Sequence, residues 1–265
     1  MKYLPGLSIS VIILLICAGT ASAQENMNRT DENGMKQGQW KKRYDNGELM
    51  YEGYFIDNEP RGEFKRYDEK GNLVSVLNYR AENDTVDALF YHNNGYLAGK
   101  GKYYQKSKTG RWKYFSEHIQ DHLLMGCVYS DDRVEGMRVK YHWNGNIAEE
   151  MEFENGIKSG YWKQYYTDGS PSLEGSFTLG KRDGVFITWH TNGEKEIAGR
   201  YTSDLRTGKW LFYNKDGSLR KEIVYNNGIP ENRAELIKQE TDYLDRLERE
   251  GGKLEDPEIT GIIKK

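Results

Sequence analysis

Aromatic residues and glycines recur along the chain with a period of 24 residues, alternating with polar positions. The same frame begins eight times, and a single step of 26 residues joins the first four repeats to the last four. The first residues of the repeats are Gly38, Gly62, Val86, Gly110, Gly136, Gly160, Gly184 and Gly208. Such self-similarity predicts one supersecondary unit per repeat, with neighbouring units stacked along one axis.

Within a repeat we number the positions as slots 1 to 24. Slot 1 is Gly except in the third repeat, and slot 18 is Phe or Tyr throughout once the two-residue insertion in the fourth repeat is allowed for. Slot 3 is aromatic at Trp40, Phe64, Trp112, Trp162, Phe186 and Trp210. Slot 6 is aromatic at Tyr67, Tyr91, Phe115, Tyr141, Tyr165, Trp189 and Tyr213.

Turn dipeptides fill slots 9 and 10, as in Asn46-Gly47, Asn144-Gly145 and Asp216-Gly217. Asn-Gly or Asp-Gly between aromatic runs is typical of a two-residue type I′ turn, which needs a positive φ at both positions. Each repeat is therefore predicted to be a β-hairpin, and a second turn such as Asn155-Gly156 leads to the next. The predicted fold is all-β: an elongated antiparallel sheet of eight consecutive 24-residue hairpins over residues 36–230. Its sixteen strands would span roughly 75 Å.

This turn would pair slot 3 with slot 16 and slot 1 with slot 18. Slot 16 is Gly in four repeats and aliphatic in most others, so an aromatic ring would lie across from a slim residue, as in aromatic rescue of a strand glycine. By alternation, slots 1, 3, 16 and 18 share one face, and slot 6 points to the other. The same reasoning assigns the aliphatic residues of slot 12 to the slot-3 face: Leu49, Leu73, Leu97, Ile147 and Leu219.

The pattern G-x-[WF]-x-x-Y-x-x-[ND]-G, followed by G-x-[FY], resembles the bacterial variant of the MORN repeat. The resemblance covers about residues 36–230, and the third and fourth repeats depart from it at Val86, Ala88 and the expanded turn Ser116–Leu124. Proteins of this kind resemble the YwqK-type family of antitoxin or immunity partners. The resemblance implies a non-catalytic, elongated sheet that binds a partner protein, with a toxin as one such partner.

The C-terminal sequence changes character after Pro230, where the glycine–aromatic pattern stops. Residues 231–250 contain an Asn232-to-Glu235 capping pattern, apolar residues at helical spacing and a final Gly251-Gly252, so an amphipathic α-helix is predicted. An open sheet leaves an uncovered end, and we expect this helix to cap it. Docking of a partner on the helix is the alternative. Residues 251–265 are expected to form a mobile tail.

The N-terminus reads as a secretory signal peptide over residues 1–23. Lys2 supplies the positive charge, Leu7 to Gly19 the apolar run, and small residues precede a cleavage site between Ala23 and Gln24. A membrane anchor would need a longer apolar run, of about 20 residues. We therefore expect an exported protein, periplasmic, cell-surface or secreted, with a flexible N-terminal segment over residues 24–35.

Composition narrows the classes of ligand and chemistry. The net charge is −3, which gives no basic surplus for nucleic acid and no support for binding membrane lipid. The 29 Gly and 34 aromatic residues, together with a shortage of Leu, Ile and Val, fit a thin sheet rather than a thick core. Cleavage would leave Cys127 as the single thiol, which we expect to be buried.

Few residues are arranged for catalysis. His118 and His122 lie four residues apart inside the expanded turn and are a weak candidate pair for a metal, but they do not form an H-E-x-x-H motif and a solvated loop is the alternative. His92, His142 and His190 all occupy slot 7, which indicates a repeated surface position. The glycines have hairpin spacing rather than that of a phosphate-binding loop. We predict no enzyme activity and no cofactor.

The slot-6 column carries the binding hypothesis. Its rings are spaced by one hairpin, roughly 10 Å, and could hold an extended peptide or a glycan by stacking. Packing of the rings against one another is the alternative. The predicted function is a scaffold that binds a partner protein, with an envelope carbohydrate-binding module as the rival. The candidate partner-binding residues are Tyr67, Tyr91, Tyr141, Tyr165, Trp189 and Tyr213.

Overall fold

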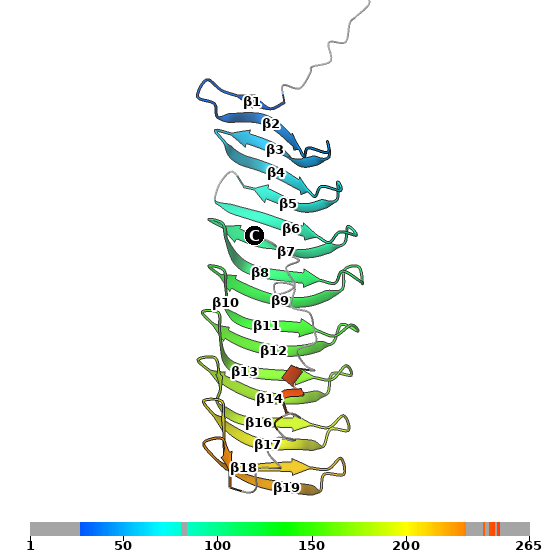
Figure 1. The fold of residues 1–265 in the computed structure, drawn as a ribbon, viewed down its shortest axis with the longest axis vertical. Helices are drawn as coiled ribbons and strands as arrows, with labels where there is room; N and C mark the ends of the chain where they lie inside the picture. The colour runs from blue at the N-terminus through cyan, green and yellow to red at the C-terminus, as the bar shows by residue number, and fades with distance from the viewer. Residues whose placement is uncertain (1–26, 81–83, 232–240, 242–243, 247, 250–265) are drawn as a thin grey trace, which may run out of the picture.

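The computed structural model describes residues 27–80, 84–231, 241, 244–246 and 248–249. These residues form one long, open antiparallel sheet in which successive hairpins follow the order of the chain (Figure 1). The predicted all-β repeat fold is confirmed. The predicted signal peptide over 1–23, its Ala23–Gln24 cleavage site and the tail over 251–265 lie outside the described residues.

The first half of the sheet runs from β1 to β9. Its strands are β1 (Arg29–Thr30), β2 (Lys36–Arg43), β3 (Leu49–Ile56), β4 (Glu59–Tyr67), β5 (Leu73–Tyr79), β6 (Thr85–Tyr91), β7 (Leu97–Tyr104), β8 (Ser107–Phe115) and β9 (Leu123–Ser130). The N-terminal segment expected to be flexible contributes β1, which pairs with β2.

The second half runs from β10 to β20. Its strands are β10 (Arg133–Val134), β11 (Gly136–Tyr141), β12 (Ile147–Glu154), β13 (Ile157–Tyr165), β14 (Pro171–Thr178), β15 (Lys181–Arg182), β16 (Gly184–Trp189), β17 (Lys195–Thr202), β18 (Leu205–Tyr213), β19 (Leu219–Asn226) and β20 (Ile229–Pro230). In the predicted C-terminal helix, the described residues 241, 244–246 and 248–249 are helical.

The predicted pairing of slots 1 with 18 and 3 with 16 is confirmed. In the β2–β3 hairpin, Gly38 lies opposite Phe55 and Trp40 lies opposite Gly53. In the β13–β14 hairpin, Trp162 lies opposite Gly175. At Gly53, Gly101 and Gly199, however, the ring nearest to the slot-16 glycine comes from the next repeat: a Cβ added at Gly53 would lie 2.2 Å from the ring of Phe64. Aromatic cover therefore links neighbouring hairpins.

The turn at slots 8 to 10 differs from the prediction. In the first hairpin, Gly47 N donates to Tyr44 O at 3.0 Å, and Tyr44 N donates to Glu48 O at 2.9 Å. Gly47 has a φ of 88°, whereas Asn46 does not have a positive φ. This geometry is a three-residue loop, a type I turn closed by a glycine in the left-handed region, and it needs only one positive φ. The predicted type I′ turn is wrong at this position.

The three-residue loop changes the register and therefore the faces. Lys42 pairs with Tyr51 but Arg43 pairs with Leu49, so Met50 at slot 13 is an extra residue. Slot 12 consequently pairs with slot 6, as Leu219 does with Tyr213. The assignment of slot 12 to the slot-3 face is wrong for all five residues expected there: Leu49, Leu73, Leu97, Ile147 and Leu219.

Type I′ turns occur instead between repeats. Asp57 and Asn58, which join β3 to β4, have φ values of 51° and 68°. Asn155 and Gly156 have φ values of 51° and 81° in the equivalent connection. In both of these repeats, a three-residue loop within the hairpin is followed by a type I′ turn to the next hairpin.

Slot 1 is glycine because the backbone there has a positive φ, between 64° and 111° in the seven repeats that carry it. The strand pairing shifts by two residues next to this slot, as it does between β3 and β4, where Glu52 pairs with Lys65 but Tyr54 pairs with Arg61. Val86 occupies slot 1 in the third repeat, and β5 pairs with β6 without any shift. A β-branched residue disfavours a positive φ, which accounts for the missing bulge.

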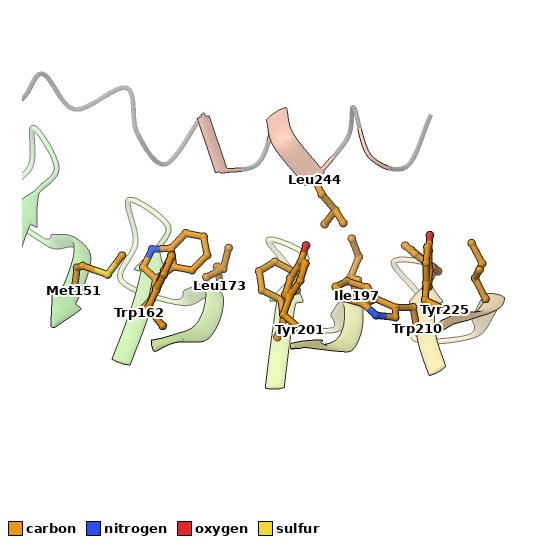
Figure 2. Close-up of a cluster of buried hydrophobic side chains, with 12 residues drawn as sticks. Met151, Trp162, Leu173, Ile197, Tyr201, Trp210, Tyr225 and Leu244 are labelled. Carbon is orange, nitrogen blue, oxygen red and sulfur yellow. The ribbon is translucent and has the colours of Figure 1, made fainter. Parts of the chain in front are cut away.

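The core lies on one side of the sheet. We call this the packed face; it carries slots 1, 3, 5, 14, 16 and 18, and the opposite outer face carries slots 2, 4, 6, 12, 15 and 17. Rings of slots 3 and 18 interleave along the packed face, with centroids 5.3 Å apart for Phe186 and Tyr201 and 5.0 Å apart for Tyr201 and Trp210. Leu244 from the helical residues joins the same buried cluster (Figure 2).

Candidate functional site: the outer face

The slot-6 rings form one column on the outer face. Each ring is carried by the last residue of its strand, and slot 7 follows as the residue that closes the loop of slots 8 to 10. The six candidates are half-buried, and Phe115 fills the remaining place in the column as a buried ring. The structure therefore brings the predicted residues into one row: Tyr67, Tyr91, Tyr141, Tyr165, Trp189 and Tyr213.

Two of these rings are held by carboxylates. The Tyr67 hydroxyl donates to Glu52 Oε1 at 2.9 Å, and the Tyr165 hydroxyl donates to Glu150 Oε2 at 2.7 Å. Burial and the neighbouring Glu150 raise the pKa of Tyr165 to about 12. The glutamates come from slot 15, one strand away, so the ring orientation is set by the sheet itself.

The slot-6 rings do not stack on one another within the described ranges. All ring pairs found there lie on the packed face, at slots 3, 5, 14 and 18. The slot-6 rings instead lie beside slot 12 of the partner strand, as Tyr141 does beside Ile147. Their outward surface is available for contact.

An exposed apolar patch continues the column over β11, β13 and β16. Tyr161 is 63 % exposed, Val185 51 % and Met137 37 %, and these three occupy slot 2 of successive repeats. We define the outer patch by slots 2, 4 and 6 of these strands: Met137, Val139, Tyr141, Tyr161, Lys163, Tyr165, Val185, Ile187 and Trp189. Slots 2 and 4 were not predicted from the sequence to be binding positions. Their alternation in M-x-V-x-Y and V-x-I-x-W is a signal that could have identified them.

Carboxylates lie between the strands of the outer patch. Because β12 pairs with β11 and β13, and β14 pairs with β13 and β16, Glu150 and Glu174 at slot 15 lie between the rows of patch residues on the same face. Glu174 lies 3.4 Å from Lys163, and both side chains are more than one third exposed. The apolar and aromatic rows of the outer patch therefore alternate with an acidic strip, Glu150 and Glu174.

Side-chain ladders hold successive hairpins together. His92, His142 and His190 place Nε2 within 2.8–3.1 Å of the slot-6 carbonyl oxygen of the next repeat. A carbonyl oxygen only accepts, so Nε2 carries the proton. Asn46 and Asn94 donate from Nδ2 to a carbonyl of the next turn, each at 2.7 Å. The three slot-7 histidines were expected at the surface; they are half-buried or buried because they join the repeats.

A column of cations runs along the packed face and was not found from the sequence. Lys36, Lys108, Lys158, Arg182 and Arg206 recur two residues before slot 1, and this recurrence is the signal that could have found them. Each lies over a ring of slot 3 or 18; the Arg182 guanidinium carbon, for example, is 4.3 Å from the Tyr201 ring centroid. Such cation–π contacts stabilise the packed face.

The other sequence candidates do not form a reactive site. His118 and His122 lie in a non-helical loop, and no group of three or more His, Cys, Asp or Glu side chains suited to a metal occurs in the described part of the chain. Cys127 is 5 % exposed, as expected for a buried thiol. No helix among the described residues is long and apolar enough to cross a membrane.

Comparison with known proteins supports a MORN-repeat protein. A family model described as "MORN repeat variant" matches residues 36–57, 60–81 and 206–227, which correspond to the β2–β3, β4–β5 and β18–β19 hairpins. No curated protein matches the chain. Among solved structures, the chain is similar to an alternansucrase in complex with isomaltononaose, at 17 % identity and a TM-score of 0.21. That match covers 76 % of this chain and 17 % of the alternansucrase.

Proposed function

We propose that this chain is an exported, non-enzymatic MORN-type scaffold that binds a partner protein through the outer patch. The observation that carries the proposal is the row of exposed Met137, Tyr161 and Val185 beside the half-buried slot-6 rings. Large exposed apolar patches bordered by polar residues mark interaction sites on soluble proteins. Tyr and Trp are also the side chains that most often dominate binding energy at interfaces.

The sheet favours binding because its contact residues are held in place before a partner arrives. Strand pairing fixes the backbone of the outer patch, and hydrogen bonds such as Tyr165 to Glu150 fix a ring. Little conformational entropy is then lost on association. The acidic strip formed by Glu150 and Glu174 favours a partner that presents Lys or Arg beside an apolar surface.

A protein toxin is the partner class that the resemblance to the YwqK-type antitoxin family implies. The sequence resemblance supports a toxin as the partner, and the predicted signal peptide supports export. A glycan is the rival ligand, since the same rings could stack on sugar faces. Trp143 is 72 % exposed, but it lies in a hairpin loop at slot 8 and is not part of the outer patch.

The test compares the full chain with two double variants. Y161A/V185A removes exposed apolar side chains from the outer patch, whereas L179A/I229A removes even more exposed ones that lie outside it, Leu179 between β14 and β15 and Ile229 in β20. Affinity capture from the producing cell identifies a partner, which is then purified and titrated against each variant. Circular dichroism confirms that all variants keep their strands.

The proposal predicts at least tenfold weaker binding for Y161A/V185A and unchanged binding for L179A/I229A. Equal binding by all three chains would exclude the outer patch as the interface. Retardation in gels containing polysaccharide, lost in Y161A/V185A and unaccompanied by a protein partner, would favour the carbohydrate-binding rival instead.

A further inference from the structure

A cavity of about 370 Å³ lies on the packed face, between β11–β14 and the helical residues around Glu248. Its sheet side carries three cations, Arg138, Lys140 and Lys158, but a single carboxylate, Glu149. It lies on the side of the sheet opposite to the outer patch. The proposed protein-binding function does not use it.

The carboxylate of Glu149 is shared among several donors. Arg138 Nη2 lies 3.1 Å and Lys140 Nζ 3.6 Å from Glu149 Oε1, while Gln164 Nε2 lies 3.4 Å from Glu149 Oε2. The Lys140 and Glu149 side chains are both less than one tenth exposed. One buried carboxylate therefore serves two cations and an amide, leaving positive charge on the sheet side of the cavity.

The indole of Trp162 contributes a buried donor to the cavity wall. Trp162 is 4 % exposed, and its Nε1 has no acceptor among the described residues. Figure 2 shows this nitrogen on the side of the ring toward Met151, which also lines the cavity. In contrast, Trp112 at the same slot donates from Nε1 to Lys102 O at 3.2 Å. The Trp210 indole Nε1 also has no acceptor among the described residues, but Trp210 does not line the cavity. A buried N–H without an acceptor is costly, and where it also borders a cavity it indicates a site that an acceptor can fill.

The helical side supplies charges of both signs. Glu248 lines the cavity and already pairs with Arg182 at 2.5 Å, and Asp245 and Arg249 complete this wall. Around Lys158, burial lowers the pKa of the ammonium; Arg138 and Lys140 lower it further, while Glu149 and Glu248 raise it. Four cations thus face three carboxylates, two of which are already paired.

We propose that this cavity binds a carboxylate group, which accepts a hydrogen bond from the Trp162 indole and neutralises the excess positive charge of Lys140 and Lys158. Glu149 and Glu248 show that the cations of this face pair with carboxylates. The group could come from two sources that share this chemistry. One is a free small carboxylate, and the other is an acidic side chain from residues 250–265, which follow Arg249 directly and include Glu255, Asp256 and Glu258.

The test follows the indole ¹⁵N–¹H resonances of the full chain, which has six tryptophans. W162F removes the donor but keeps an aromatic ring, and so assigns the Trp162 resonance. Succinate is titrated against the full chain, with sodium chloride at matched ionic strength as the control. The same titration is made with E255Q/D256N/E258Q, which removes the internal carboxylates, and with K158Q. The Trp112 indole, already bonded to a backbone carbonyl, is the internal reference.

A saturable downfield shift of the Trp162 resonance with succinate, weakened about tenfold in K158Q, would establish a free carboxylate as the ligand. A Trp162 resonance that is downfield before titration, moves upfield in E255Q/D256N/E258Q and then responds to succinate would establish the internal source. A Trp162 resonance that moves in neither the titration nor the triple variant would overturn the proposal.

Discussion

The slot-16 glycines allow a sharp test of how rings and backbone fit together. Gly175 on β14 and Gly199 on β17 occupy the same slot on the packed face, one repeat apart. A Cβ at Gly199 would lie 2.3 Å, 2.4 Å and 2.8 Å from three atoms of the Trp210 ring. A Cβ at Gly175 would meet its nearest atom, on Trp162, at 3.3 Å. G199A and G175A thus add the same methyl group, but the space around the new Cβ differs greatly between the two sites.

The expected change in stability depends on whether the neighbouring ring can move away from the added methyl group. In a strand, Gly→Ala is favourable by about 0.5–1 kcal/mol when nothing clashes. Trp210 cannot withdraw easily, because it is fully buried and lies 5.0 Å from Tyr201 and 5.8 Å from Phe186 between ring centroids. Overpacking of such a core costs about 1–3 kcal/mol. We expect G199A to destabilise the protein by about 2 kcal/mol and G175A to change stability by less than about 0.5 kcal/mol.

Urea unfolding, followed by circular dichroism and tryptophan fluorescence, measures both variants. Because repeat proteins can unfold in parts, hydrogen exchange of the β17–β18 amides provides a local check. The double variant G199A/W210L should be more stable than the sum of its single changes, since Leu removes the overlap. Equal stability of G199A and G175A would refute the role of the ring over the backbone.

Three further predictions concern single interactions. N192D keeps the oxygen that accepts within its own turn but loses the donor to the next turn, so urea unfolding should show a loss of about 1 kcal/mol. R206M removes the cation 4.8 Å from the Trp210 ring centroid and should cost about 1–2 kcal/mol in the same assay. The pKa of Tyr165 is raised in the folded state, which means that folding favours the protonated phenol. The stabilisation by this phenol should therefore be fully present below pH 10 and lost as the pH rises through about 12. E150Q should lower that pKa in an ultraviolet titration while leaving it above 10, because burial remains the largest cause.

The architecture explains why aromatic residues replace aliphatic ones in this protein. A single sheet has no second layer to fill the space above its backbone, so each repeat must cover its neighbour with its own side chains. Rings at slots 3 and 18 do this over glycine at slot 16, and cations such as Arg182 cover the rings in turn. The helical residues add Leu244 and Glu248 over part of the same face.

The sequence by itself determined the repeat, the hairpins and the pairing of slots 3 and 16. These features depend on local turn preferences and on the 24-residue period. The same residue types recur at the same slots in each repeat, so a single sequence contains this evidence many times. The glycine at slot 1 was also visible, and its replacement by Val86 marks the one place where the bulge is missing.

Only the tertiary structure decided which face each residue of the return strand occupies. Asn-Gly is compatible with both a two-residue and a three-residue loop, and the choice moves slot 12 from one face to the other. The outer patch, the cation column and the cavity lined by Trp162 likewise depend on which strands lie side by side. In the outer patch and the cation column, residues such as Tyr161 and Arg182 are separated by a full repeat from the equivalent residues of the next repeat. Their chemistry becomes a surface only when the hairpins stack.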